Sequence, residues 1–317
     1  MKFTGCITER QRSMRSKGIH SPAWSHLAAA AFLAFVFCSA GAAQTNARPI
    51  EIAVVGFGDT QTAEKVSEQI AESFRANQFR IIDNDLAAAA AKGVGYNGSL
   101  NMNREEARNL ASAIGCDFFI TGIAQTLRRS PSTSPVYFES YASVFFVSAR
   151  SGKLVFWERL EFRRPTAVEA ERTLLNALSV GTARERYQAT IRRIAEEERN
   201  LRAIAIDRSA PVIDLMPDAE TTSGVRAPRP FRRPKPPYPD AAAHDQVEAT
   251  VDALVDIDAN GKVGQIEIAR WAGYGLDESV INTVKEIDFF PAMRDGVAIP
   301  MRVLLRYNFR KPPQQSQ

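Results

Sequence analysis

The chain contains 317 residues, of which 45% are hydrophobic and 24% charged, the composition of a soluble globular protein with room for two domains. Its formal charge of +4 arises in the first 42 residues, where five Lys or Arg accompany one Glu, so the balanced remainder gives no support for nucleic-acid binding. Only one of the three cysteines, Cys116, lies beyond residue 43, which excludes an internal disulfide framework there.

Residues 1–43 have the layout of an export signal. A basic head precedes the apolar stretch LAAAAFLAFVFCSAGAA, residues 27–43, which ends in small residues suited to cleavage. The alternative is an uncleaved anchor, because 17 apolar residues are at the lower limit for spanning a bilayer. Bulky Phe37 before Cys38 argues against lipidation. The remainder is predicted to lie outside the cytoplasm, with membrane contact only through this segment.

Residues 48–205 are predicted to form an α/β domain. Short β-branched and aromatic runs indicate strands, and apolar residues spaced by three or four indicate helices. Asn103 is a candidate N-cap and Gly115 a candidate helix stop. The predicted strands are 49–57, 79–83, 117–127, 136–149 and 153–162, and the predicted helices are 62–77, 103–115 and 167–205, the last broken at Gly181.

This domain offers little for catalysis. Gly56, Gly58 and Lys65 follow a strand, but the spacing matches neither a phosphate loop nor a dinucleotide fingerprint, so a plain strand-to-helix turn is expected. Cys116 has no histidine in its own domain and is expected to be a buried, inert thiol. His244 lacks further ligands and is expected to be a solvated residue before a strand. We therefore expect no catalytic residue, no metal and no cofactor.

Residues 206–233 are predicted to form a linker. The sequence RAPRPFRRPKPPYP, residues 226–239, alternates proline with Arg or Lys and carries no acidic residue. Proline at this density favours an extended, semi-rigid tether. The alternative is a basic strip that contacts an acidic partner or anionic lipid.

Residues 256–267, DIDANGKVGQIE, match the oxygen-ligand pattern of a calcium loop. A calcium loop of this type needs flanking helices, whereas the residues on both sides alternate between apolar and polar with a period of two. Asn260-Gly261 is also a strong two-residue hairpin signal. The segment is therefore predicted to be a β-hairpin, with weak calcium binding at its tip as the alternative.

The rest of residues 234–312 completes a second domain. Leu276, Val280 and Val284 form one helical stripe, and 288–300 is predicted to turn the chain. Apolar residues then alternate with polar ones from Met301 to Phe309, which predicts a final strand. The predicted fold class is thus α+β: an N-terminal α/β sandwich followed by a small antiparallel sheet with one helix.

Both domains resemble known families. In the first, the order of strands and helices, with IAVVGF early and AIGCDFFITG after the second helix, resembles the TolB N-terminal, CsgG and LpoB envelope proteins. In residues 234–310, the run Pro237-Tyr238-Pro239, the hairpin, Phe290-Pro291-Ala292 and the closing aromatic strand resemble the TonB C-terminal domain. The first resemblance implies a binding or assembly module rather than an enzyme.

The resemblance to TonB implies a periplasmic protein that binds a partner by β-strand addition to an edge strand. The partner would be an outer-membrane transporter, another envelope protein or a second copy of the chain, and binding would drive transport if energy is transduced. The alternative is an envelope-assembly or scaffolding factor without energy transduction. Ser16 and His20 have the spacing of the TonB coupling motif, but they lie outside the apolar run. The partner-binding residues implied are Pro236, Tyr238, Pro239, Met301, Val303, Leu305, Tyr307 and Phe309.

Overall fold

The fold is built around a five-stranded mixed sheet and a second, antiparallel sheet, with helices packed on both. The computed structural model describes residues 48–76, 78–132, 135–179, 181–203, 212–213 and 225–311. The predicted signal or anchor, residues 1–43, lies outside the described residues. Within the described ranges, no helix combines the length and hydropathy needed to cross a membrane.

The first sheet has the strand order β2-β1-β3-β4-β5. Strand β1 pairs in parallel with both of its neighbours, β2 and β3, and β3, β4 and β5 form an antiparallel meander. The predicted strands are all present, and their bounds are β1 Ile50–Val54, β2 Phe79–Ile81, β3 Phe118–Arg129, β4 Tyr137–Ser148 and β5 Leu154–Arg164.

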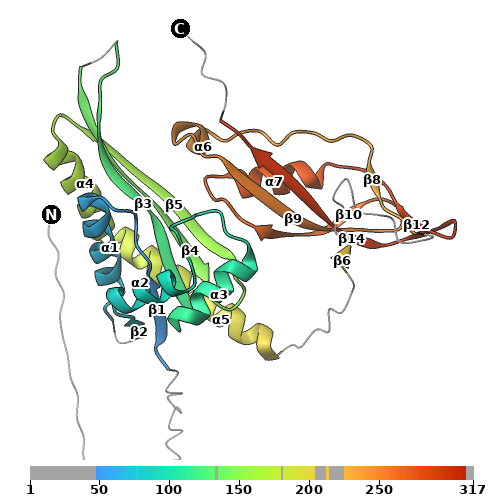
Figure 1. The fold of residues 1–317 in the computed structure, drawn as a ribbon, viewed down its shortest axis with the longest axis horizontal. Helices are drawn as coiled ribbons and strands as arrows, with labels where there is room; N and C mark the ends of the chain where they lie inside the picture. The colour runs from blue at the N-terminus through green and yellow to red at the C-terminus, as the bar shows by residue number, and fades with distance from the viewer. Residues whose placement is uncertain are drawn as a thin grey trace, which may run out of the picture. The chain divides into compact units, whose positions relative to one another are not determined.

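Helices cover both faces of this sheet (Figure 1). On one face, α1, α4 and α5 pack against the side chains of Val54, Phe118 and Phe146. On the other, α2 and α3 pack against Ala53 and Phe119. The helix bounds are α1 Gln61–Ser73, α2 Asn84–Gly93, α3 Arg104–Ile114, α4 Ala167–Ser179 and α5 Thr182–Ala203.

The predicted boundaries of α3 are confirmed. The Asn103 side chain accepts hydrogen bonds from the backbone of Glu105 and Glu106, and the Glu106 side chain accepts one from the Asn103 backbone, which is a capping box. Gly115 ends the helix with φ +78° in the left-handed region. The predicted interruption of the long helical region at Gly181 is also confirmed, whereas helix α2 was not predicted.

The second sheet has the strand order β10-β9-β14-β6, with α7 packed against β9 and β10. The predicted hairpin, helix and final strand are confirmed, so the fold class is the one expected. The structure adds the short helix α6 and the two-residue strand β6, which pairs in parallel with the start of β14. The bounds are β6 Val212–Ile213, α6 Asp240–His244, β9 Ala249–Ile257, β10 Val263–Arg270, α7 Leu276–Lys285 and β14 Met301–Phe309.

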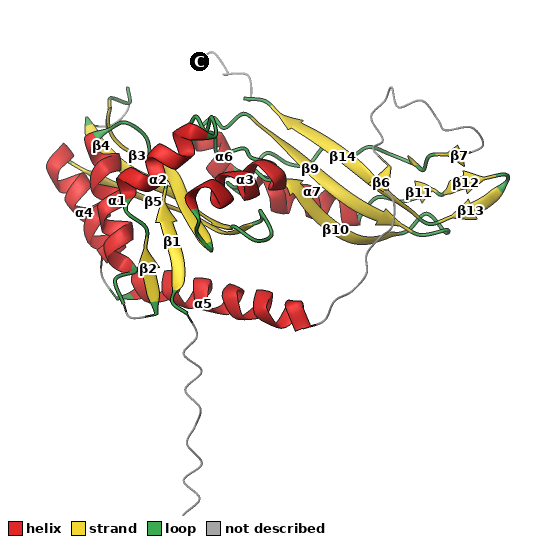
Figure 2. Cartoon of the chain, turned by 60° about the horizontal axis from the view of Figure 1, so that its bottom comes forward, coloured by secondary structure: helices red, strands yellow, loops and turns green. Residues whose placement is uncertain are grey.

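Short strands continue this region beyond the ends of the long strands β9, β10 and β14 (Figure 2). The segment predicted only to turn the chain contains an antiparallel hairpin, and two parts of the predicted linker pair with it. The bounds are β7 Val225–Arg226, β8 Arg229–Pro230, β11 Phe289–Phe290, β12 Ala292–Arg294 and β13 Val297–Ile299. Residues 225–230 are therefore paired, although the sequence favoured an unpaired tether.

The two sheets share a hydrophobic core. Phe145 on β4 stacks on Trp271, with ring centroids 6.1 Å apart, and lies 5.5 Å from the ring of Tyr274. Both faces of β4 are consequently buried. Helices α1, α4 and α5 cover one face, and α2, α3 and the C-terminal region together cover the other. All described residues belong to one compact unit.

Candidate partner-binding site

The β9–β10 turn is held by hydrogen bonds within the hairpin. Asp258 Oδ1 accepts from the backbone N–H groups of Asn260 and Lys262, both at 2.8 Å. The Gly261 N–H donates to the Asp258 carbonyl, and of these turn residues only Gly261 has positive φ, +78°. The turn is thus a type I turn followed by a left-handed glycine, rather than the two-residue turn predicted from Asn-Gly. A Cβ at Gly261 would lie 1.8 Å from the Phe289 carbonyl oxygen, so glycine is required there.

The remaining oxygen ligands of the calcium pattern point elsewhere. Arg302 Nη2 donates to Asp256 Oδ2 at 2.7 Å. Glu267 Oε1 lies 2.6 Å from Arg104 Nη1 and 2.8 Å from Lys153 Nζ. Burial opposes ionisation of Glu267, but the hydrogen bond from Lys153 and the charge of Arg104 hold its pKa below the usual value. The hairpin prediction is confirmed: Asp258 accepts hydrogen bonds within the turn, and Asp256 and Glu267 form ion pairs.

The final strand β14 buries one row of the predicted partner-binding side chains. Met301, Val303 and Phe309 are almost fully buried against the core, and Leu305 and Tyr307 are partly buried in the same cluster. Met301, Val303 and Phe309 thus belong to the same core as the apolar face of α7, and partner contact by the five side chains stays a prediction. A partner would meet the main chain of β14.

The outer edge of β14 is partly covered by the chain itself. On its inner side, β14 pairs with β9 along its whole length. On its outer side, Arg302 and Val303 pair with Val212 and Ile213 of β6. No other strand pairing to this side is present among the described residues. The stretch of β14 that could pair with a partner strand is therefore Leu304–Phe309, shorter than the predicted Met301–Phe309.

The segment before α6 is fixed beside the end of β14. Tyr238 donates its hydroxyl hydrogen toward the carbonyl of Val247 at 2.5 Å, and its ring lies 6.1 Å from that of Phe309. Ser279 on α7 donates to the Pro237 carbonyl at 2.6 Å. Pro236 and Pro239 are half-buried on either side. Tyr238 thus caps this end of the sheet, and partner contact by Pro236, Tyr238 and Pro239 stays a prediction.

Polar contacts accompany the shared core between the two sheets. Asn101, in the loop before α3, accepts from the Thr250 N–H at 3.0 Å and donates to the carbonyls of Thr250 and Trp271 at 2.8 and 2.7 Å. Trp271 Nε1 donates to the Gly152 carbonyl at 3.2 Å. Gly273 has φ +70°, and a Cβ there would meet the Phe145 ring at 2.3 Å. The approach of the two sheets therefore depends on residues from both.

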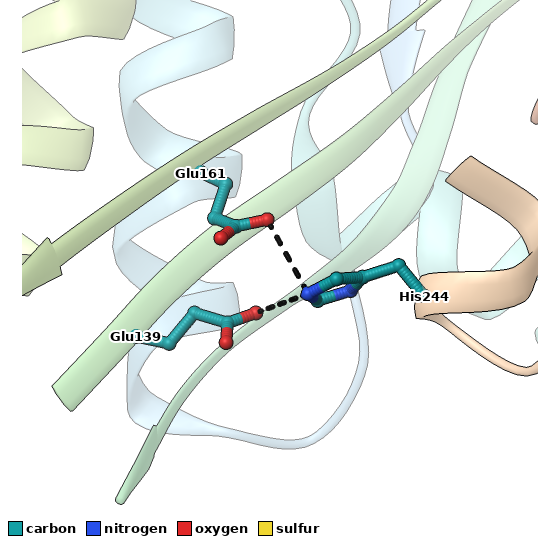
Figure 3. A group of neighbouring side chains, drawn as sticks. All are labelled: Glu139, Glu161 and His244. Carbon is teal, nitrogen blue, oxygen red and sulfur yellow. Dashed lines mark ion pairs between the residues drawn. The ribbon is translucent and has the colours of Figure 1, made fainter. Parts of the chain in front are cut away.

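An ion-pair cluster also joins the sheets (Figure 3). His244 Nε2 on α6 lies 3.6 Å from Glu139 on β4 and 3.6 Å from Glu161 on β5, and Nδ1 lies 2.9 Å from Asp245 Oδ1. Arg159 pairs with Glu139 at 3.4 Å and with Asp245 at 2.8 Å, and it also pairs with Glu161. His244 was predicted to be a solvated residue before a strand; it is exposed and precedes β9, but it lies on α6 and also contacts carboxylates of the first sheet.

The donors of this cluster are of the kind that bind metals, since a histidine nitrogen and two carboxylate oxygens lie within 4.8 Å of one another. Arg159 already supplies positive charge to the same carboxylates. Burial raises the pKa of Glu161, but hydrogen bonds from Arg159 and Arg163 outweigh it and hold that pKa below its usual value. We interpret the cluster as an ion-pair contact between the sheets.

A groove of about 300 Å³ lies between β5 and β10, and Asp277 on α7 is one of the residues that line it. Consecutive residues of both strands line the groove. Because β5 and β10 are the edge strands of their sheets, the groove lies between the two sheet edges. The Asp277 carboxylate accepts from the N–H groups of Ala272 and Gly273 at 2.9 and 2.8 Å. Burial raises the pKa of Asp277 to about 7 despite these hydrogen bonds, with a smaller contribution from neighbouring Glu278.

The candidates for catalysis in the first domain show no activating partner among the residues that the structure describes. Cys116 Sγ donates weakly to the Ala111 carbonyl at 3.8 Å, and burial raises the pKa of its thiol to about 12. Because the thiolate is the reactive form, this cysteine is unsuited to nucleophilic attack at neutral pH. Gly56 and Gly58 both have positive φ in the turn between β1 and α1. That the protein is not an enzyme remains an expectation.

The described residues thus define an α+β protein whose C-terminal sheet ends in a strand with an open stretch of edge. Residues 234–310 match the family model for the C-terminal region of Gram-negative bacterial TonB proteins. The predicted resemblance of this region to TonB is confirmed. No curated protein matches the chain.

Several solved structures are similar to parts of the chain. The TonB C-terminal domain of Pseudomonas aeruginosa is 18% identical, covers 33% of this chain and 100% of its own, and has a TM-score of 0.26. The LpoB C-terminal domain of Salmonella enterica is 12% identical, with 38% and 89% coverage and a TM-score of 0.27. A lipoprotein of Neisseria meningitidis is 15% identical, with 47% and 99% coverage and a TM-score of 0.31. These values are too low to support an argument about function.

Proposed function

We propose that this chain is a periplasmic binding protein of the cell envelope that receives an extended segment of a partner along β14, from Leu304 to Phe309. The observation that carries the proposal is the open outer edge of this strand within a region that matches the TonB C-terminal model. Main-chain hydrogen bonds along such an edge supply affinity, and side chains on the two faces supply selectivity.

An assembly or scaffolding role is the form of this function that the contacts favour. A domain that reaches a distant transporter needs a free tether, whereas here Phe145, Trp271 and Asn101 hold the C-terminal sheet against the first sheet. The pairing of β7 and β8 with β12 and β11 shortens the linker further. Engagement of an outer-membrane transporter, with energy transduction, is the second candidate, and the family match supports it.

The proposal is tested by placing a photo-crosslinking amino acid on β14 in the full chain, in cells that produce it. Asn308 is the test position because its side chain is exposed on this strand. Asn109, exposed on α3, is the matched control. We expect a specific adduct from position 308 and none from 109. Identification of a transporter would favour the second candidate, and identification of an assembly protein or a second copy would favour the first. The same adducts from both positions, or none, would contradict strand addition at β14.

A further inference from the structure

Part of the predicted linker is fixed in place by strand pairing. In β8, Arg229 and Pro230 pair with Phe290 and Phe289 of β11. The Phe231 N–H then donates to the Asp288 carbonyl at 2.9 Å. Because directly opposed residues of antiparallel strands share a face, Arg229 and Phe290 lie on one face and Pro230 and Phe289 on the other. The basic segment therefore has a defined surface.

The face that carries Phe290 is exposed. Phe231 and Phe290 are 58% and 49% exposed, and their ring centroids lie only 4.0 Å apart. The Arg229 guanidinium lies 6.0 Å from the Phe290 ring. Phe289, on the opposite face, is 2% exposed. The two adjacent phenyl rings therefore form a small exposed apolar patch beside the Arg229 guanidinium.

The basic side chains of this segment and of neighbouring β12 have no carboxylate partner in the part of the chain that the structure describes. Among the described residues, no ion pair within 4.0 Å involves any of six basic side chains, namely Arg226, Arg229, Arg232, Arg233, Lys235 and Arg294. Of the nearby carboxylates, Asp288 is paired with Lys262 at 2.7 Å. No acidic residue occurs between 225 and 239. No carboxylate among the described residues therefore forms an ion pair with this positive charge.

We propose that Arg229, Phe231, Arg232, Arg233 and Phe290 form an aromatic–arginine surface that docks on a bilayer bearing anionic phospholipid headgroups. Guanidinium groups match phosphate oxygens in charge and geometry. Exposed aromatic rings gain a favourable position at the boundary between headgroups and acyl chains. A soluble acidic polypeptide would satisfy the charges but would not by itself require two adjacent phenyl rings. This proposal is independent of strand addition at β14.

The local test uses the full chain with Phe231→Trp. Vesicles of phosphatidylcholine alone are compared with vesicles containing phosphatidylglycerol, and the signal of the parent tryptophans is subtracted. With phosphatidylglycerol we expect a blue shift in the emission of the indole introduced at position 231 and quenching by brominated acyl chains, both weakened by added salt. With phosphatidylcholine alone we expect neither. This readout reports on position 231 whether or not residues 27–43 enter the bilayer.

The charge test uses Arg232→Gln with Arg233→Gln in the same chain. Each cation near an anionic surface contributes about five-fold in affinity, so we expect the pair to weaken phosphatidylglycerol binding by about 30-fold. Arg108→Gln with Arg199→Gln is the matched control, because both residues are exposed on helices of the first domain. We expect that control to bind like the parent.

Three results would overturn the proposal. The first is equal emission at position 231 with both vesicle compositions, and the second is equal loss of binding in the two double variants. The third is a combination of two observations. The parent chain binds a polyglutamate peptide and the 232/233 double variant does not, while phosphatidylglycerol causes no shift in the emission of the indole at position 231. That result would assign the surface to an acidic polypeptide. Thermal unfolding followed by circular dichroism confirms that each variant is folded.

Discussion

Arginines at the contact between the two sheets and arginines of the aromatic–arginine surface differ in their access to carboxylates. At the contact, Arg104, Arg159 and Arg270 each pair with at least one Glu or Asp. On the surface, Arg232 and Arg233 are exposed, and neither forms an ion pair within 4.0 Å among the described residues. Paired arginines hold parts of the fold together, whereas unpaired ones remain available to another molecule.

The aromatic residues divide in the same way. Trp271 is 1% exposed and packs on Phe145, whereas Phe231 is 58% exposed and packs on a ring that is itself half exposed. Burial removes apolar area from water, so only the first arrangement contributes strongly to folding. The comparison teaches that residue type alone does not separate stability from recognition, since both regions use arginine and aromatic side chains.

The largest test of this comparison is Trp271→Ala against Phe231→Ala. We expect Trp271→Ala to lower the free energy of unfolding by about 3–5 kcal/mol, because it opens a cavity in the shared core and leaves the Gly152 carbonyl without its donor. Phe231→Ala should change it by less than about 0.5 kcal/mol. Urea unfolding followed by circular dichroism gives both values. Equal losses of unfolding free energy for the two substitutions would contradict the distinction between a stabilising contact and an exposed binding surface.

The second test is the pH dependence contributed by Asp277 beneath the contact. Burial raises its pKa in the folded protein to about 7 from its ordinary value of 3.8, so between these values the folded state binds the proton and the unfolded state does not. Stability from this group is present below about pH 4 and is lost as the pH rises through 7. We expect the free energy of unfolding to fall by about 2–3 kcal/mol between pH 5 and pH 7.5.

Asp277→Asn should flatten this slope, because asparagine does not titrate. Asp258→Asn is the control, since the pKa of Asp258 is lowered by hydrogen bonds from the Lys262 and Asn260 backbone and its titration lies below this pH window. Urea unfolding at several pH values measures the slopes. An unchanged slope in Asp277→Asn would show that the buried carboxyl is not its source.

Much of the fold could be predicted because local patterns determine it. Asn103 and Gly115 set both ends of α3, and alternation between apolar and polar residues identified β9, β10 and β14. Helix α2 was missed because its run of alanines has no apolar stripe, although Asp83 is an N-cap signal before it. The paired parts of the linker were missed because strands of two residues are too short for any periodicity.

The contact between the sheets could not be read from the sequence in the same way. The uninterrupted apolar run around Phe145 indicates a strand buried on both faces, but it does not say which part of the chain covers the second face. Asn101 lies in a loop among other polar residues, and its bonds to Thr250 and Trp271 span about half of the chain. For β14, the alternation located the strand, but the occupation of its outer edge by Val212 and Ile213 depends on tertiary pairing.

The third test is Asn101→Ala against Asn109→Ala. Removal of the Asn101 side chain leaves the N–H of Thr250 and the carbonyls of Thr250 and Trp271 without this partner, at partly buried positions. We expect a loss of about 2 kcal/mol in the free energy of unfolding. Asn109 is exposed on α3, so alanine there should be neutral or slightly stabilising. Similar urea midpoints for the two variants would mean that the polar contact contributes nothing to the joined sheets.

The smallest test returns to arginine itself, with Arg104→Gln set against Arg232→Gln. Arg104 donates to Glu267 at 2.6 Å and to the Ser151 carbonyl at 2.9 Å, and its side chain is only 22% exposed. Glutamine there leaves Glu267 with Lys153 alone, so we expect a loss of about 1 kcal/mol that shrinks in high salt. Arg232→Gln should leave the urea midpoint unchanged and reduce only vesicle binding. If Arg232→Gln destabilised the fold as much as Arg104→Gln, the charge of Arg232 would be balanced within the protein. The aromatic–arginine surface would then have no unbalanced charge at this position to attract an external anion.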